Sequence, residues 1–381
     1  MDLSHGLETA DRLPAMPFYE GASRVEVARM DAANFHGLVD RLKWITPKFA
    51  LKLGDRIGAA CIARTGSPYA AEIAACSSIL GTGVFTLNTG YEWACTAMVR
   101  EDQAQQKPVL HRVLDWSLPM GKFMHVARYE TAHGPYYDIN WAGNSGIING
   151  AAKDRFVISI NQSPIPMRSK LGKAGFPLDW LLQRRKTFTS CDWLPSHLLR
   201  HVFETAPDFA TACNLLENTP LAIPVIFTIC GTKAGERKII ERTEHDKHVI
   251  EDREICTANH WQRADWKGHP RPLRSRDRLS AAKILTLFQL NAFGCDIADP
   301  DARTLKILQN GHGLIKLFSH CPNIGNQHRV MFISTVRKIK PSDIKAGLDH
   351  LLNFAFTFRG RANGTDDFCS LHNKLNNIDY F

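Results

Sequence analysis

A short apolar run that begins with a cysteine is followed, after a polar turn, by a second short apolar run. Two runs in this order strongly limit the folds that the chain can adopt. The first run, residues 95–99, begins at Cys95, and the second, residues 111–116, carries Arg112 and Asp115. Two short β-prone runs around a charged, glutamine-rich turn predict a β-hairpin. Because the second strand of a hairpin returns beside the first, we expect Cys95 to lie near the cation and the carboxylate. Such surroundings favour the thiolate and orient a nucleophile, so this hairpin is the first candidate for a reactive site.

The composition is that of a folded globular chain. Of the 381 residues, 44% are hydrophobic and 22% are charged, values that are ordinary for globular domains and exclude disorder as the main state. The net charge of +9 comes from 47 Lys and Arg against 38 Asp and Glu. It is scattered apart from short clusters at 183–186 and 271–278. A solvated basic surface explains this pattern better than a nucleic-acid site, so we expect no nucleic-acid partner.

The chain lacks the sequence signals of export and membrane insertion. Residues 1–8 have neither the basic nor the apolar region of a secretory signal, and no apolar run approaches the roughly 18 residues of a membrane helix. The ten cysteines are dispersed without a Cys-x-x-Cys pair, which in such a chain predicts reduced core thiols. We therefore expect a cytoplasmic protein without stable membrane insertion.

The predicted secondary structure changes at Cys95, from mainly helical before it to a mixture of strands and helices after it. Residues 1 to about 25 are expected to form an extended lead-in, because they contain prolines and few periodic apolar positions. From 24 to 62 apolar residues recur every three or four positions, and a further helix is expected over 67–81. We therefore divide the chain into a helical N-terminal segment, 1–94, and a second segment, 95–381.

The second segment mixes strand patterns with helical patterns. The expected strands after the hairpin cover residues 123–129, 136–142, 145–148, 155–161, 220–230, 238–244, 248–257, 313–318 and 329–335. The expected helices cover about 178–186, 195–218, 279–290 and 344–356. Helices, antiparallel strands, more helices and late strands predict an α+β layered fold rather than a Rossmann alternation.

No motif for a cofactor or metal stands out. Residues 143–146 lack the dinucleotide-binding fingerprint, and residues 231–238 lack the Gly-Lys-[Ser/Thr] ending of a phosphate-binding Walker loop. The 16 histidines show no metal-ligand spacing such as His-x-x-x-His. We therefore expect neither a cofactor nor a metal ion.

Several motifs in order resemble a known family. Residues 95–99 resemble the Cys-Thr-Ser-Ile-Val that opens its mature subunit, and residues 111–115 resemble its His-Gly-Arg-Asn-Leu-Asp element. Residues 72–92 resemble the family's approach to the nucleophile, 156–161 its Phe-Thr-Ile-Ser strand, and 278–281 its Arg-Arg-Thr-Ser-Ala segment. The family is that of the N-terminal-nucleophile cysteine hydrolases, which includes acid ceramidase, N-acylethanolamine acid amidase and choloylglycine hydrolase (penicillin V acylase). The similarity extends from about residue 70 to residue 290.

The resemblance implies a fold, a maturation step and an activity. The fold would be a four-layer αββα sandwich of antiparallel sheets, with residues 1–94 as propeptide or α-subunit. The zymogen would cut its own Ala94–Cys95 bond, and the two fragments would stay associated. The new α-amine of Cys95 can then serve as the base for its own thiol. The mature protein would hydrolyse a linear N-acyl amide through a thioester on Cys95.

The resemblance also implies roles for the other site residues. Arg112 would lie near the sulfur and favour the thiolate, while Asp115 would hold and orient the α-amine. Asn161 and Asn259 would donate hydrogen bonds to the tetrahedral oxyanion. Arg278 would supply a supporting charge.

The chain departs from the family pattern in two places. Val113 replaces the asparagine between the arginine and the aspartate of the hairpin. The Thr-Asn-Tyr-Asp-His-Trp element appears one residue short, as residues 257–261, so Asn259 falls on either the asparagine or the aspartate. Arg276 also competes with Arg278 for the late arginine.

Other readings of the same residues stay open at the level of sequence. Cys95 can be a core thiol, and Arg112 with Asp115 a structural ion pair. The activity can be that of an acyltransferase of the isopenicillin N acyltransferase type, or the chain can bind an acyl ligand without turnover. The sequence also leaves open a homo-oligomer.

Overall fold

The structure is a computed structural model. It describes residues 16–43, 46–90, 94–102, 107–115, 123–253, 255–269, 275–287, 305–311, 314–317 and 330–335. Almost all of them belong to one compact unit, which comprises residues 1–311 and 315–337.

The N-terminal segment forms a short strand followed by helices, as the apolar spacing predicts. The first helix is fixed at its start by a capping box, in which Ser23 Oγ accepts from the backbone N–H of Glu26 while the Glu26 carboxylate accepts from that of Ser23. The fourth helix stops at Gly81, whose φ of 81° suits glycine. These elements are β1 (Phe18–Glu20), α1 (Arg24–Met30), α2 (Ala32–Leu42), α3 (Lys48–Arg64), α4 (Ala70–Leu80) and α5 (Val84–Thr89).

The larger sheet has eight strands in the order β1-β4-β5-β6-β7-β9-β10-β11. Its pairings are antiparallel except that β1 runs parallel to β4. The strands after β1 are β4 (Met124–Tyr129), β5 (Tyr136–Trp141), β6 (Asn149–Ala152), β7 (Phe156–Gln162), β9 (Val225–Cys230), β10 (Arg237–Arg242) and β11 (Lys247–Ile250).

The second sheet contains the predicted hairpin. Its order is β12-β2-β3-β16-β14-β15, and β2 pairs antiparallel with β3 so that Cys95 faces Leu114 and Ala97 faces Arg112. The hairpin prediction is therefore confirmed. The strands are β2 (Ala94–Asp102), β3 (Lys107–Asp115), β12 (Ile255–Thr257), β14 (Leu305–Gly311), β15 (Leu314–Leu317) and β16 (Val330–Thr335).

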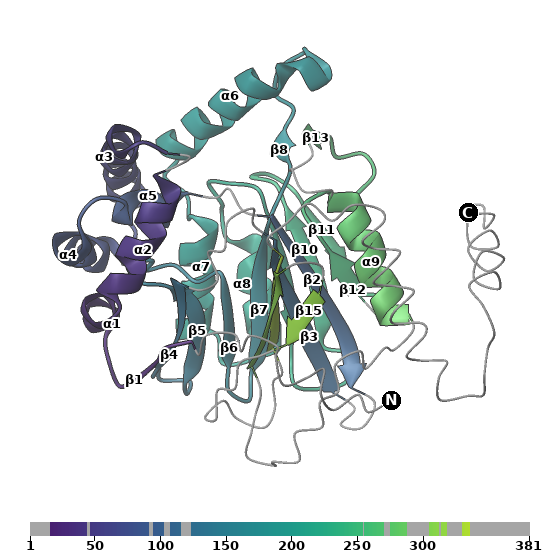
Figure 1. The fold of residues 1–381 in the computed structure, drawn as a ribbon. Coiled ribbons are helices and arrows are strands. Elements are labelled where there is room, and N and C mark those ends of the chain that lie inside the picture. Colours follow the sequence, from purple (N-terminus) through teal and green to yellow (C-terminus); the bar gives the residue numbers. More distant parts are fainter. Residues whose placement is uncertain are drawn as a thin grey trace, which may run out of the picture. The chain divides into compact units, whose positions relative to one another are not determined.

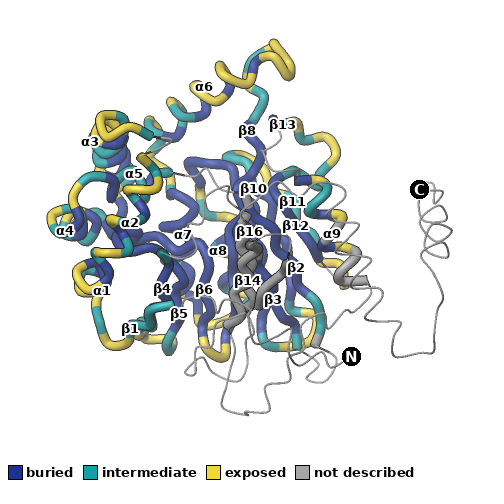
Figure 2. Tube along the Cα trace, viewed as in Figure 1, coloured by how far each residue is buried: buried dark blue, intermediate teal, exposed yellow. Residues whose placement is uncertain are grey.

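The two sheets share one core, and helices pack on the other face of the larger sheet and on β2 and β12 of the smaller one (Figure 1). Apolar side chains of β2 and β3 join those of β7, β9 and the N-terminal helices in this core. A second core lies between the larger sheet and the helices α7 and α8, and a third between α9 and the strands β2 and β12. Figure 2 shows most strands of the larger sheet, together with β2, β3 and β12 of the smaller one, mostly buried, while α6 is largely exposed. The remaining elements are β8 (Ile165–Pro166), β13 (Gly268–His269), the short helix η3 (Gly172–Gly175), α6 (Phe176–Thr189), α7 (Pro195–Thr205), α8 (Phe209–Asn218) and α9 (Ser275–Leu287).

The predicted α+β class is confirmed, but the smaller sheet is mixed rather than antiparallel, because β16 runs parallel to both β3 and β14. Some predicted elements are also wrong. Residues 145–148 form a loop rather than a strand, because their N–H groups bond Asn88, Asn144 and the backbone of Ser196 instead of a neighbouring strand. The strand predicted at 248–257 is two strands, β11 and β12, which belong to different sheets. The helical pattern predicted over 195–218 forms two helices, the second of which is capped by Asp208. The strand β14 was not predicted, and the helix expected at 344–356 lies outside the described residues.

Candidate active site

Cys95 lies at the start of β2, in the core between the two sheets. Its side chain is fully buried and belongs to the same apolar cluster as Val99 and Leu114. Alternate residues of β2 point to the opposite face, where Met98 packs against α9. The strand therefore directs Cys95 towards the larger sheet rather than towards α9.

The backbone N–H of Cys95 donates its hydrogen bond to a side chain, whereas in a regular sheet it would donate to a backbone carbonyl of the neighbouring strand. It bonds Asn259 Oδ1 at 2.6 Å. The strand β12 pairs antiparallel with β2 and ends at Thr257, which faces Ala97. Continuing that register brings residue 259 beside Cys95. There the buried side chain of Asn259, rather than a backbone carbonyl, accepts the hydrogen bond from Cys95 N.

Arg278 reaches the same backbone from α9. Its Nη1 donates to Cys95 O at 2.6 Å and to Thr96 Oγ1 at 2.7 Å, and its Nη2 donates to Asn259 Oδ1 at 2.8 Å. Asn259 Nδ2 donates in turn to Gln162 O at 2.7 Å. The orientation of the Asn259 amide is thus set by two donors at its oxygen and one acceptor at its nitrogen.

Arg112 and Asn161 form a buried polar pair between the two sheets. Arg112 faces Ala97 in the hairpin, so it lies on the same face of its sheet as Cys95. Its guanidinium donates to Asn161 Oδ1 and to Ile160 O on β7. Asn161 Nδ2 donates to Ala258 O at 2.9 Å and makes a longer contact of 3.4 Å with Cys95 O. These bonds pair the two terminal nitrogens of a fully buried guanidinium and both polar atoms of a fully buried amide.

The structure therefore brings five of the six predicted site residues into one hydrogen-bonded group, namely Cys95, Arg112, Asn161, Asn259 and Arg278. For the sixth, Asp115, the backbone register places it opposite Ala94, the residue that precedes Cys95. The competing Arg276 is exposed. Between the two late arginines, only Arg278 is bonded to the backbone of Cys95.

Two further residues belong to this group and were not predicted. Ser275 Oγ accepts from the Asn259 backbone N–H at 2.7 Å and lies 2.8 Å from His260 Nδ1. Burial, with the charges of Arg276 and Arg278, lowers the pKa of His260 to about 4. The ring is therefore neutral near pH 7, and its Nδ1 can accept the Ser275 hydroxyl proton. Ser275 precedes the helix that the sequence predicted from residue 279, and nothing in the sequence indicated a contact to a loop 16 residues earlier.

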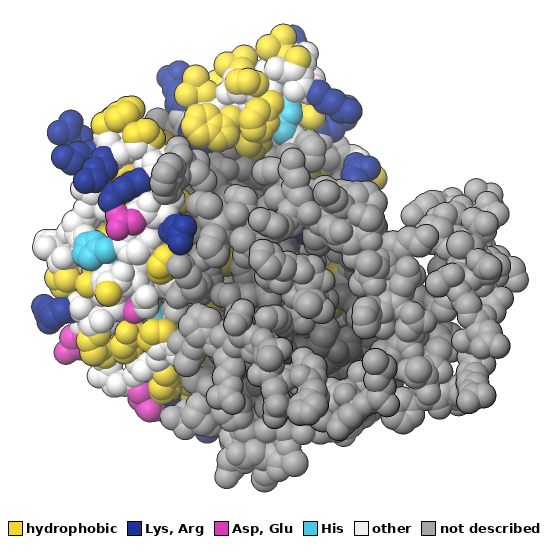
Figure 3. Space-filling view, viewed as in Figure 1, with side chains coloured by type: hydrophobic (Ala, Val, Ile, Leu, Met, Phe, Trp, Pro, Cys, Tyr) yellow, Lys and Arg dark blue, Asp and Glu magenta, His cyan; other side chains and the backbone are white. Residues whose placement is uncertain are grey.

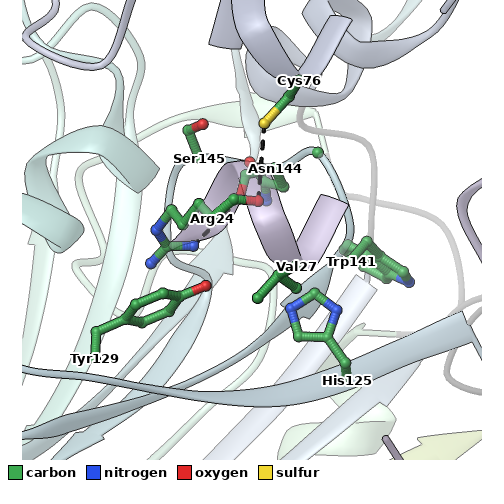
Figure 4. A pocket seen from close by; sticks show the side chains of 9 residues that line it. Arg24, Val27, Cys76, His125, Tyr129, Trp141, Asn144 and Ser145 are labelled. Carbon is green, nitrogen blue, oxygen red and sulfur yellow. Dashed lines mark hydrogen bonds between the residues drawn. The ribbon is translucent and has the colours of Figure 1, made fainter. Parts of the chain in front are cut away.

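A separate polar pocket joins the N-terminal segment to the larger sheet (Figure 4). Arg24 Nη1 bonds Asp138 Oδ2 at 2.6 Å, and its guanidinium stacks over the Tyr129 ring at 4.4 Å. Cys76 Sγ contacts the carbonyl oxygen of Arg24 at 4.0 Å. None of the predicted site residues lines this pocket, whose members are Arg24, Val27, Cys76, His125, Tyr129, Trp141, Gly143, Asn144 and Ser145.

The described part of the chain contains neither a metal-binding cluster nor a membrane-spanning helix. There, no group of three or more His, Cys, Asp and Glu residues is arranged to hold a metal ion. Within the same ranges, no helix combines the length and apolar character that crossing a membrane requires.

The fold and the site define an α+β protein with a cysteine buried between two sheets and polar side chains bonded to its backbone. No protein-family model matches the sequence, and no curated protein matches it. Among the solved structures that match is the Caenorhabditis elegans N-acylethanolamine-hydrolyzing acid amidase (NAAA) ortholog. That match has 17% sequence identity and a TM-score of 0.34, and it covers 44% of this chain and 71% of that chain. A likeness at this level assigns no activity to this chain.

Proposed function

We propose that this chain is the zymogen of a cysteine amidohydrolase that cuts its own Ala94–Cys95 bond and then hydrolyses a linear N-acyl amide. The observation that carries the proposal is the way the Cys95 backbone is held. Its N–H and its carbonyl oxygen are bonded by Asn259 and Arg278, which come from different elements. A core thiol has no need of polar side chains on its backbone, and burying an amide such as that of Asn259 is costly unless it is paired.

The first reaction is an N-to-S acyl shift followed by hydrolysis. Cys95 Sγ attacks the Ala94 carbonyl carbon, the C–N bond to Cys95 breaks, and the proton of the thiol passes to the departing nitrogen. Water then cleaves the Ala94 thioester, which releases the Ala94 carboxylate and restores the Cys95 thiol. Asn259 Oδ1, which accepts from Cys95 N in the uncut chain, is suited to hold the resulting α-amine.

The second reaction uses the same sulfur on an external amide. The α-amine of Cys95 takes the thiol proton, the thiolate attacks the acyl carbon, and the amine of the substrate leaves with that proton. Water completes the cycle by hydrolysing the thioester. Asn161 Nδ2 already lies 3.4 Å from the Cys95 carbonyl oxygen and is our candidate donor to the oxyanion. Arg112 would position Asn161, and Arg278 and Asp115 would hold the α-amine end of the site.

The burial of Cys95 agrees with a zymogen. In the uncut chain its side chain is inaccessible to solvent, so a substrate needs an opening that cleavage of the preceding bond can provide. We propose that the fragments then stay together, because α1 to α4 contribute to the same core as β2 and β3. Ion pairs also cross the cut, among them Arg24 with Asp138 and Glu72 with Arg200 at 2.6 Å each.

The layer order supports the proposed αββα assignment. The helices α7 and α8 pack on the outer face of the larger sheet, and α9 packs on the outer face of the smaller one. The substrate class, a linear N-acyl amide, comes from the sequence resemblance at the hairpin.

The test compares the wild-type chain with Cys95→Ala and with a matched control, Cys256→Ala. Cys256 is a buried cysteine on the adjacent strand, where it faces Met98. Intact mass is measured after purification, and turnover of N-acyl amides is measured with and without an added amine acceptor. We expect wild type and Cys256→Ala to yield two fragments that meet at Ala94/Cys95 and to hydrolyse the amide, whereas Cys95→Ala stays whole and inactive.

Each other outcome has a defined meaning. A single full-length mass for wild type, with amide turnover absent, would overturn the zymogen and favour a protein that binds an acyl ligand. Product formation only in the presence of the amine acceptor would replace hydrolysis by acyl transfer. Equal cleavage in wild type and Cys95→Ala would remove Cys95 as the nucleophile.

A further inference from the structure

Glu241 is a buried carboxylate on β10 to which the chemistry at Cys95 gives no direct part. Aspartate and glutamate side chains usually lie at the surface, where Figure 3 shows several of them on one face of the molecule. Glu241 is instead fully buried. It lies on the same face of β10 as Ile239, which belongs to the same apolar cluster as Cys95. A charge in such a core is costly unless it is bonded, so the groups that bond it indicate its role.

The Glu241 carboxylate holds two successive backbone N–H groups of one loop. Its Oε1 accepts from Gln262 N at 2.7 Å, and its Oε2 accepts from Arg263 N at 3.1 Å. Oε2 also lies 3.0 Å from Nδ1 of His248, the residue opposite Glu241 on β11. The loop follows β12 and comprises residues 258–263; we call it the Asn259 loop. A carboxylate of the larger sheet therefore holds the loop that continues from β12 of the smaller sheet.

Other bonds hold the Asn259 loop less firmly or at other points. The Arg263 side chain pairs with Asp246 in the turn after β10, but this ion pair is partly exposed and contributes little. Gln262 Nε2 donates to Cys256 O at 2.9 Å, which ties the loop back to the strand it leaves. Ser275 on α9 accepts from the backbone N–H at the start of the loop. Glu241 thus anchors the far end of the loop on a buried strand.

We propose that Glu241 is a positioning residue, which holds the Asn259 loop so that Asn259 Oδ1 stays within reach of the Cys95 nitrogen. Glu241 acts through the backbone of residues 262 and 263 and needs no contact with substrate. The catalytic part of this inference rests on the proposed function, in which Asn259 holds the α-amine that cleavage creates. After cleavage the preceding peptide no longer fixes Cys95 N, so Asn259 must be fixed from its own side. A displacement of about 1 Å can reduce a rate by roughly 100-fold.

The experiment compares Glu241→Gln with a matched control, Glu236→Gln. Glu236 also accepts from two backbone N–H groups, those of Thr232 at 2.9 Å and Lys233 at 3.0 Å, but it precedes β10 at the opposite end of the strand. In Glu241→Gln one carboxylate oxygen becomes an amide NH₂ group. This group cannot accept a hydrogen bond, so one N–H of the Asn259 loop is left unpaired.

The first measurement is hydrogen exchange of the full chain, resolved to single backbone amides by mass spectrometry. We expect Glu241→Gln to speed exchange about tenfold at residues 262 and 263, which lose an acceptor. Exchange should also become faster at Asn259, whose N–H donates to Ser275 and not to Glu241. Glu236→Gln should leave the Asn259 loop unchanged and act on Thr232 and Lys233 instead.

The second measurement separates kcat from KM for an N-acyl amide, with each variant assayed well below its unfolding midpoint in urea. Glu241→Gln should lower kcat about tenfold, which corresponds to about 1.4 kcal/mol, and should leave KM within about twofold of wild type. Glu236→Gln should keep the kcat of wild type. Glu241→Asp keeps both acceptor oxygens, so it should retain more of the kcat, and it serves as the test variant if Glu241→Gln fails to fold.

Three results would overturn the proposal. They are unchanged exchange at Asn259 in Glu241→Gln, a lowered urea midpoint with the kcat of wild type, and an equal loss of kcat in Glu236→Gln. The second of these would show a purely structural role. If the wild-type chain turns over no amide, the proposed function fails by itself. Exchange at Asn259 requires no turnover and would still decide whether Glu241 fixes the loop.

Discussion

Arg278 offers a demanding test of the site, because the chain supplies its own control two residues away. Arg278→Gln removes the donors to Cys95 O at 2.6 Å and to Asn259 Oδ1 at 2.8 Å. Arg276→Gln alters the same helix at an exposed position. Both changes remove one positive charge from the first turn of α9, so they differ mainly in the contacts to Cys95 and Asn259.

The expected magnitude follows from those two contacts. A hydrogen bond to a charged group contributes about 1.5–3 kcal/mol, and Arg278 is partly exposed, so the lower end applies to each. Loss of both therefore raises the barrier by about 3 kcal/mol, which corresponds to a rate reduction of roughly 100-fold. Arg278→Lys keeps the charge but not the planar fork, so it should recover only part of the rate.

The assay follows two rates, the appearance of the fragments by intact mass and kcat/KM for an N-acyl amide. The unfolding midpoint in urea is measured for each variant, so that loss of stability is separated from loss of rate. A reduction below about threefold for Arg278→Gln, or an equal reduction for Arg276→Gln, would refute the reasoning, because the contacts at Cys95 would then have no effect on the barrier.

Three further predictions concern stability and positioning. Burial is the main cause that lowers the pKa of His197 from 6.5 to about 3. Between these two pH values the unfolded chain binds a proton that the folded chain does not. The free energy of unfolding should therefore decrease as the pH falls from 6.5 towards 3, by up to about 1.4 kcal/mol per pH unit. Urea unfolding of His197→Gln should show a flatter pH dependence in that window, and an unchanged slope would contradict this. Ser275→Ala should slow amide hydrolysis about fivefold, because the hydrogen bond from Asn259 N is lost. The unfolding midpoint in urea is measured for the same variant. Rescue by Ser275→Thr would show that the hydroxyl group, and not the packing of the side chain, is responsible. Gly58→Ala should destabilise the fold by about 1–3 kcal/mol in urea unfolding, because the new Cβ meets the Phe85 carbonyl; a stable variant would show that α3 and α5 can separate.

The spacing of apolar residues along the chain was enough to predict the strongly periodic helices and the central hairpin. The helices at 24–62 and 67–81 follow from apolar spacing, and the return of the second strand beside Cys95 follows from two strands around one turn. Both depend on residues that are close in sequence, which is why pattern alone could indicate them. The division of 248–257 between two sheets could not be predicted, since nothing local distinguishes a continued strand from a crossing one.

The contacts at Cys95 were decided by the tertiary structure. Pattern indicated which residues to consider, but Arg276 and Arg278 were equivalent until the packing of α9 on β2 left one exposed and turned the other to the Cys95 carbonyl. Likewise the sequence could not tell whether Asn259 presents its oxygen or its nitrogen. That orientation is set by donors on β2 and α9 and by an acceptor on β7. A hydrogen bond depends on distances and angles between segments far apart in the chain, and only their packing against one another defines these.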